Sequence, residues 1–346
     1  MEAVLSDVTA LAYWRSHSES LGEVLIPRRM TPKRKGRPSI DAPSATTATD
    51  IASWGLADPE DIHLLVSSKA SRRRVSGVTC TISSCEFPAH SFARTLGQVY
   101  VVSPELLFIQ LAQQLSLAAL LEVGYELCGT YRLGETPAYG MEPLTSTAAI
   151  KSYAQRAQGM RGQPAALQAC QWLADGSGSP AETALSIMFR LPYRHGGYGL
   201  GKPLLNHEIK LNENAEHILG RKTMRPDFYW VEAKHPAEYD GRRYHSSDEQ
   251  AEYDERRRNA YAAMNMNVTV LTTRHLYDLD LLDEMVKTIR TNTKIRQRRL
   301  PEGYDFKHRE LYEETCSYWL ELKRGNLSSA ELAWRASRYD APDEPW

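Results

Sequence analysis

Three carboxylates lie inside two short apolar segments in the second half of this 346-residue chain. Asp227 directly precedes the aromatic residues 228–230, and Glu238 and Asp240 lie in the following segment, which ends at a glycine. Burying a carboxylate charge costs several kcal/mol unless a positive group compensates it. Hard divalent cations prefer oxygen ligands of this kind. We therefore predict that Asp227, Glu238 and Asp240 bind Mg²⁺ or Mn²⁺.

A β-hairpin is the element that brings these carboxylates together. The aromatic residues at 228–230 favour one strand, residues 231–236 contain a turn-compatible Lys-His-Pro, and the apolar residues after them favour a second strand. Side chains alternate between the faces of a strand, so Glu238 and Asp240 share one face, where Asp227 of the neighbouring strand meets them. Converging carboxylates repel one another unless a cation lies between them. The pattern predicts a centre for metal-assisted hydrolysis.

These segments carry a family resemblance. The strings RPDFYW at 225–230 and AEYDG at 237–241, followed by His245, resemble the restriction-endonuclease-like, or PD-(D/E)xK, nucleases, on the branch similar to very-short-patch repair endonucleases. The resemblance covers roughly residues 178–292. It implies an α/β core, a mixed sheet flanked by helices, with a metal-bearing hairpin, a following helix and another strand. The activity it implies is hydrolysis of DNA phosphodiester bonds. That branch lacks the lysine of the third motif position, and here Asp240 stands where the superfamily often has it.

A second alignment of the same motif uses Asp227 with Glu232 and Lys234. Asp227 and Glu232 are an odd number of positions apart, so on one continuous strand they would face opposite ways. The gap is also too short for two strands and a turn. We therefore favour Glu238 and Asp240. Lys234 falls in the hairpin turn, where it contacts phosphate as a point charge or is simply solvated.

Two further residues are candidates for the catalytic set. Glu182 opens a predicted helix after Ser179 and Pro180, a sequence typical of a capping box. The resemblance implies that an acidic residue on this helix joins the metal site, so both roles stay open for Glu182. His245 follows the hairpin, where an imidazole acts as a general acid or base near neutral pH or forms polar surface. The predicted catalytic residues are Asp227, Glu238, Asp240, His245 and Glu182.

Clustered basic side chains indicate a nucleic-acid partner. The candidates for contact with the phosphate backbone of DNA are Arg72, Arg73, Arg74, Lys234, Arg242 and Arg243. Charge runs are also common on solvated surfaces, so these clusters by themselves identify no substrate. Asp254 and Arg257 are three positions apart on a predicted helix, and we interpret them as a pair that stabilises it.

The chain divides into four segments by composition and pattern. Residues 1–50 contain a helix near the start and a flexible basic segment, and residues 51–177 form an α+β module with a helical linker. Residues 178–300 hold the nuclease-like domain, and residues 301–346 form a helical extension. A Gly/Ser break at residues 175–178 marks the main boundary.

The α+β module carries a looser resemblance. Strands are predicted at 62–67, 78–82 and 98–102, and a helix is predicted over 104–123. These strands and the string SPELLFIQLA resemble the C-terminal part of AbiEi-type antitoxins and regulators. The resemblance implies a toxin–antitoxin or defence-system protein as a partner.

Composition bounds the class of protein. Hydrophobic residues make up 42% and charged residues 25% of the chain, and the formal net charge is −1, which suits a soluble protein of about two domains. Five scattered cysteines favour a reducing compartment over a disulfide framework. The N-terminus lacks a basic segment followed by an apolar one, and polar residues interrupt the longest apolar stretch. We therefore expect a cytoplasmic protein with no signal peptide and no membrane partner.

Two functions fit these patterns. The first is a Mg²⁺- or Mn²⁺-dependent endonuclease that cuts DNA in defence or repair. The second is a DNA-binding regulator or toxin–antitoxin component that keeps the nuclease fold without cleaving, and the missing lysine favours it.

Overall fold

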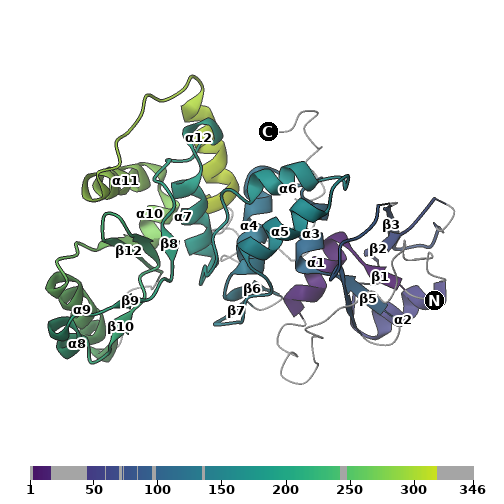
Figure 1. The fold of residues 1–346 in the computed structure, drawn as a ribbon, viewed down its shortest axis with the longest axis horizontal. Helices are drawn as coiled ribbons and strands as arrows, with labels where there is room; N and C mark the ends of the chain where they lie inside the picture. The colour runs from purple at the N-terminus through teal and green to yellow at the C-terminus, as the bar shows by residue number, and fades with distance from the viewer. Residues whose placement is uncertain are drawn as a thin grey trace. The chain divides into compact units, whose positions relative to one another are not determined.

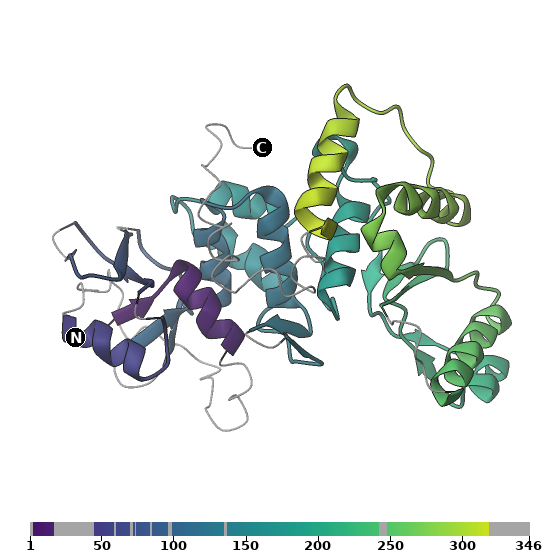
Figure 2. The ribbon, with the colours of Figure 1, turned by 180° about the vertical axis from the view of Figure 1, so that it is seen from behind.

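The computed structural model describes residues 3–16, 45–58, 60–69, 72, 74–83, 85–95, 99–134, 137–241 and 248–317. The chain folds into two compact units of mixed α/β structure, each with a mixed sheet flanked by helices (Figure 1, Figure 2). Of the described residues, the first unit contains those up to 127 together with 132–171, and the second contains 128–131 and 172–317. The Gly/Ser residues at 175–178 belong to the second unit.

Two predicted segments lie largely outside the described residues. The basic segment predicted within residues 1–50 falls between 17 and 44, and the predicted C-terminal extension is described only as far as 317. Within the described ranges, no helix combines the length and the apolar character needed to cross a bilayer.

A five-stranded sheet forms the centre of the first unit, in the order β3-β2-β1-β5-β4. Its strands are β1 Ala3–Leu5, β2 Ile62–Val66, β3 Val78–Ile82, β4 Phe92–Arg94 and β5 Val99–Val102. β1 pairs in parallel with β5, and β2 with β3, whereas the other two pairings are antiparallel. The three predicted strands are confirmed as β2, β3 and β5. The sequence does not predict the buried central strand β1, because three residues give no clear alternation.

The helices described in this unit are α1 Asp7–Ser16, α2 Ala45–Ser53, α3 Pro104–Leu111, α4 Leu117–Cys128, α5 Thr147–Arg156 and α6 Gln163–Ala169. β6 Tyr131–Leu133 and β7 Pro137–Tyr139 form a short two-stranded sheet. The prediction of one helix over 104–123 is wrong. Ser116 starts a second helix there, because its Oγ accepts a hydrogen bond of 3.1 Å from the Ala119 N–H. Ser103 caps α3 in the same way.

A four-stranded sheet organises the second unit, in the order β13-β12-β11-β8. Its strands are β8 Leu204–Leu205, β11 Phe228–Trp230, β12 His235–Asp240 and β13 Thr269–Thr272, and β9 Ile209–Lys210 pairs with β10 Thr223–Met224 in a separate hairpin. The predicted hairpin is confirmed, since β11 and β12 are antiparallel neighbours. β12 also pairs in parallel with β13. The second strand begins at His235, two residues earlier than predicted. Lys234 ends the turn in a left-handed conformation, with φ of 48°.

Helices cover both faces of this sheet (Figure 1). They are α7 Pro180–Arg190, α8 Glu213–Leu219, α9 Asp248–Ala263, α10 Thr273–Tyr277, α11 Leu279–Thr293 and α12 Tyr304–Tyr312, with a 3₁₀ turn at Tyr193–His195 and a π turn at Glu313–Ser317. On one face Phe189 of α7 packs against Phe228 and Trp230, with ring centroids 5.3 and 6.0 Å apart. On the other face Tyr229 belongs to an apolar cluster with residues of α8 and α9, including Tyr261. α8 and α9 lie side by side in both views (Figure 1, Figure 2).

Candidate functional site

The hairpin of β11 and β12 sets the positions of the three predicted metal ligands. Phe228 lies opposite Ala237 in the antiparallel register, so Asp227, one residue before β11, lies beside Glu238. Glu238 and Asp240 line the same pocket, as alternation along β12 requires. The aromatic strand therefore places Asp227 against the polar face of its neighbour.

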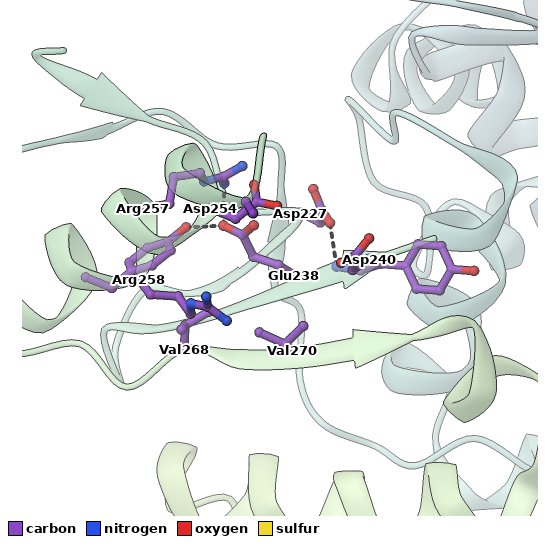
Figure 3. A pocket seen from close by; sticks show the side chains of 11 residues that line it. Asp227, Glu238, Asp240, Asp254, Arg257, Arg258, Val268 and Val270 are labelled. Carbon is purple, nitrogen blue, oxygen red and sulfur yellow. Dashed lines mark hydrogen bonds and ion pairs between the residues drawn. The ribbon is translucent and has the colours of Figure 1, made fainter. Parts of the chain in front are cut away.

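A pocket of about 340 Å³ lies between the hairpin, β13 and α9 (Figure 3). Its charged lining residues are Asp227, Glu238, Asp240, Asp254, Arg257 and Arg258. Tyr261 of α9 and two valines before and on β13 supply apolar surface. Four carboxylates and two guanidinium groups thus line one space, an arrangement that leaves an excess of negative charge.

Asp227 has a strongly perturbed carboxyl group. Its Oδ2 accepts a hydrogen bond of 2.6 Å from the Tyr239 N–H. Burial raises the pKa of Asp227, and the charges of Glu182 and Glu238 raise it further, to about 8. The Tyr239 N–H and the charge of Arg257 lower the pKa, but by less. A carboxyl group that resists ionisation among other carboxylates is well suited to bind a cation.

Glu182 lies at the N-terminus of α7 and is only 8% exposed. Its N–H donates to Ser179 Oγ, which donates in turn to Glu182 Oε1 at 2.9 Å. Oε2 accepts from the Gly178 N–H at 2.8 Å and from the Asn206 amide at 2.7 Å. Ser179 thus caps α7 as predicted, but the reciprocal bond of a capping box is replaced, because Glu182 accepts from the N–H of Gly178 instead of that of Ser179. Burial raises the pKa of Glu182, and its charge acts on Asp227, so the same side chain also belongs to the electrostatics of the pocket.

Glu238 is held by two residues of α9 (Figure 3). Its Oε1 accepts hydrogen bonds from the Arg257 guanidinium and the Tyr261 hydroxyl. Burial raises the pKa of Glu238, and together with the nearby charge of Asp254 it outweighs the lowering by Arg257 and Tyr261. Glu238 is therefore engaged by the helix rather than by the other carboxylates of the pocket.

Oxygen donors and excess negative charge match the ligand preference of Mg²⁺ and Mn²⁺. In the described part of the chain, however, no three or more His, Cys, Asp or Glu side chains are positioned together to hold a metal ion. Asp227, Glu238 and Asp240 line one pocket, but their carboxylates do not converge on one point where an ion could be coordinated. Glu238 accounts for part of this, because Arg257 and Tyr261 hold its carboxylate.

Comparison with known proteins gave no relative. No protein-family model, curated protein or solved structure matches this chain. Geometry and residue chemistry in the pocket therefore carry the functional argument.

Four of the predicted residues lie outside the described ranges. Arg242, Arg243 and His245 fall between the end of β12 and the start of α9, and Arg73 falls in a gap before β3. Arg72 and Arg74, on either side of that gap, are exposed side chains of the first unit.

The turn between β11 and β12 holds the residues of the rejected alignment. Lys234 is exposed there, and its N–H donates to the Val231 carbonyl at 3.1 Å. Glu232 is exposed in the same turn, whereas Glu238 lines the pocket. The structure thus puts Glu238 beside Asp227, and Lys234 remains a prediction for phosphate contact.

Asp254, Arg257 and Tyr261 line the pocket, although the sequence assigns them no role in it. Their spacings of three and four residues place them on one face of α9. The sequence feature that could have revealed this role is the row of polar and aromatic side chains on the helix that follows the hairpin. The predicted helix-stabilising pair of Asp254 and Arg257 leaves out a further contact, the ion pair of Arg257 with Glu238 of the sheet.

Proposed function

We propose that the second unit is a metal-dependent DNA endonuclease with a restriction-endonuclease-like core. The observation that carries the proposal is Asp227, whose pKa is raised to about 8 by burial and by the charges of Glu182 and Glu238. Asp227 also lines a pocket of about 340 Å³. Such a carboxyl group is costly as a structural element but suits a bound cation.

The order of the elements supports the proposed core. α7 carries Glu182, the β11–β12 hairpin carries Asp227 and Glu238, and α9 connects β12 to its parallel neighbour β13. This succession agrees with the metal-bearing hairpin, following helix and further strand that the family resemblance implies.

Asp227 and Glu238 are the residues that would hold Mg²⁺ or Mn²⁺, and Asp240 offers a further oxygen donor in the same pocket. When bound there, a divalent cation would supply Lewis-acid activation of water and would stabilise negative charge on a phosphate. To serve as ligands, Asp227 would lose its proton and Glu238 would lose its bond to Arg257. His245, as a general acid or base, completes the proposed set.

Cleavage of plasmid DNA tests this function. The wild-type protein is expected to cut in Mg²⁺ and to stop in EDTA, and Asp227→Asn and Glu238→Gln are expected to lower the rate by about 10³-fold or more. Glu208→Gln is the matched control, because Glu208 is an acidic side chain on the surface that pairs with Arg225. A folded Asp227→Asn protein that cuts at the wild-type rate contradicts the proposal.

A second candidate function is a DNA-binding regulator or toxin–antitoxin component that does not cleave. The observation that favours it is the ion pair of Glu238 with Arg257, which occupies one carboxylate of the proposed metal site. Duplex binding without turnover in either Mg²⁺ or Mn²⁺ would select this function over the first.

A further inference from the structure

Arg257 is the basic residue of the pocket that binds Glu238. Its Nη2 donates both to Glu238 Oε1 and to the Arg225 carbonyl, the latter at 3.1 Å. Its Nε is buried and has no hydrogen-bond partner among the described residues. An arginine carries five N–H donors in a rigid fork, so this side chain keeps unused donor capacity next to the acidic group.

The charge of the pocket creates a difficulty for a DNA substrate. Glu238, Asp240 and Asp254 line it beside Asp227, and a phosphodiester that approaches Asp227 meets the repulsion of the ionised carboxylates. A guanidinium at the same place relieves that repulsion and binds phosphate oxygens through two parallel hydrogen bonds. Arg257 is suited to this task because its side chain is still 23% exposed while its head group lies at Glu238.

We propose that Arg257 contacts the scissile phosphate of DNA and exchanges its ion pair with Glu238 for that contact. This inference rests on the proposed function and names the group that receives the substrate. Tyr261 remains on Glu238 through its hydroxyl, so the carboxylate stays in the pocket as the guanidinium leaves. Substrate binding then frees Glu238 to act beside Asp227, and phosphate binding and cation binding strengthen each other.

The exchange explains two features together. Glu238 is occupied by α9 in the protein alone, and no acidic group of three is assembled in the described residues. Both follow if the acidic set is completed only when a phosphate takes Arg257. The arrangement keeps the cation site incomplete until DNA is present.

The matched control for Arg257 is its neighbour Arg256. Arg256 is also an arginine of α9, but it forms an i,i+4 ion pair with Glu252 and does not line the pocket. A substitution there changes the net charge of α9 by the same amount without changing the pocket.

Duplex DNA binding in EDTA tests the phosphate contact without any metal or turnover. Arg257→Gln is expected to reduce the slope of log affinity against log salt by about 0.9, the effect of one lost phosphate contact on duplex DNA, whereas Arg256→Gln leaves it unchanged. Glu238→Gln is expected to tighten binding several-fold, because it releases Arg257, and Glu208→Gln is not. Removing the Glu238 charge also lowers the repulsion of DNA, so the double variant Glu238→Gln, Arg257→Gln separates the two effects. Tightening of the same size in the Arg257→Gln background contradicts the exchange.

Cleavage in Mg²⁺ gives the second measurement. Arg257→Gln is expected to lower kcat by about 10²-fold, Arg257→Lys by less, and added guanidinium ion to restore part of the activity of Arg257→Ala. An unchanged salt slope and an unchanged kcat in a folded Arg257→Gln protein overturn the proposed phosphate contact. They do not contradict the proposed endonuclease activity. If the wild-type protein cuts no DNA, the proposed endonuclease function is contradicted. The salt slopes then test the phosphate contact by themselves.

Discussion

Asp227 and Asp283 are both partly buried aspartates of the second unit, yet the protein surrounds them in opposite ways. Asp283 Oδ1 accepts a hydrogen bond from the Tyr198 hydroxyl at 2.6 Å and lies 3.2 Å from His308 Nε2. Burial acts to raise the pKa of Asp283, but the contacts with His308 and Tyr198 outweigh it and lower the pKa. The pKa of Asp227 instead rises to about 8, because burial and two neighbouring carboxylates act together.

The surroundings of the two aspartates match this difference. Around Asp283, His308 Nδ1 lies 2.5 Å from the Gly196 carbonyl, and a Cβ on Gly196 would come within 2.3 Å of the Lys307 carbonyl oxygen. The glycine therefore lets α12 approach closely, and the cluster is satisfied from within. Asp227 lines an open pocket with other acids. A carboxylate that the protein itself satisfies is a packing element, whereas one left among like charges calls for a ligand from outside.

Replacing each aspartate by asparagine should change stability in opposite directions. Asp227→Asn mimics the protonated carboxyl group and removes the free-energy cost of protonating Asp227 on folding, so the free energy of unfolding without metal at pH 7 should rise by about 1–2 kcal/mol. Asp283→Asn weakens the contacts with Tyr198 and His308 and should lower it by about 1 kcal/mol, since the aspartate is partly exposed. Chemical denaturation of the two variants measures both. Equal losses would remove the contrast between the two sites.

Added Mg²⁺ should stabilise the protein through one aspartate and not the other. At a concentration ten times the dissociation constant, a cation that binds only the folded state adds about 1.4 kcal/mol to the free energy of unfolding. The gain should persist in Asp283→Asn and disappear in Asp227→Asn. Thermal unfolding with Mg²⁺ and with EDTA measures it. A gain that survives in Asp227→Asn would place the ion elsewhere.

The stabilisation by Mg²⁺ should also depend on pH, because Asp227 must lose its proton to bind. Its folded pKa of about 8 lies above the unfolded value, so the proton competes with the cation more strongly as the pH falls. Between pH 8 and pH 6.5 the gain from Mg²⁺ should fall by about 1 kcal/mol. The same titration on Asp283→Asn should follow the wild type. A gain that is constant over this range argues against Asp227 as the ligand.

The sequence predicts the hairpin that positions Asp227 and Glu238, because strand alternation is a local property with a period of two residues. It also predicts the cap at Glu182, whose partners lie within four residues apart from Asn206. Local patterns of this kind need no knowledge of tertiary packing.

The partners of Glu238 are beyond such reasoning. Arg257 and Tyr261 lie 19 and 23 residues further along the chain, and they meet Glu238 only because α9 packs across that face of the sheet. The raised pKa of Asp227 likewise depends on Glu182, which approaches from a separate helix. Spacing along the chain identifies the acidic residues of the site. Tertiary packing determines which of these carboxylates are paired with a basic side chain.

A crystal structure of the protein soaked with Mn²⁺ tests the central claim most directly, because anomalous scattering locates the ion without ambiguity. We predict a peak at oxygen-ligand distance, about 2.0–2.3 Å, from the Asp227 carboxylate, with Glu238 still paired with Arg257 because no DNA is present. A map with no peak in the pocket, and with Asp227 still bonded to the Tyr239 N–H, would contradict the claim.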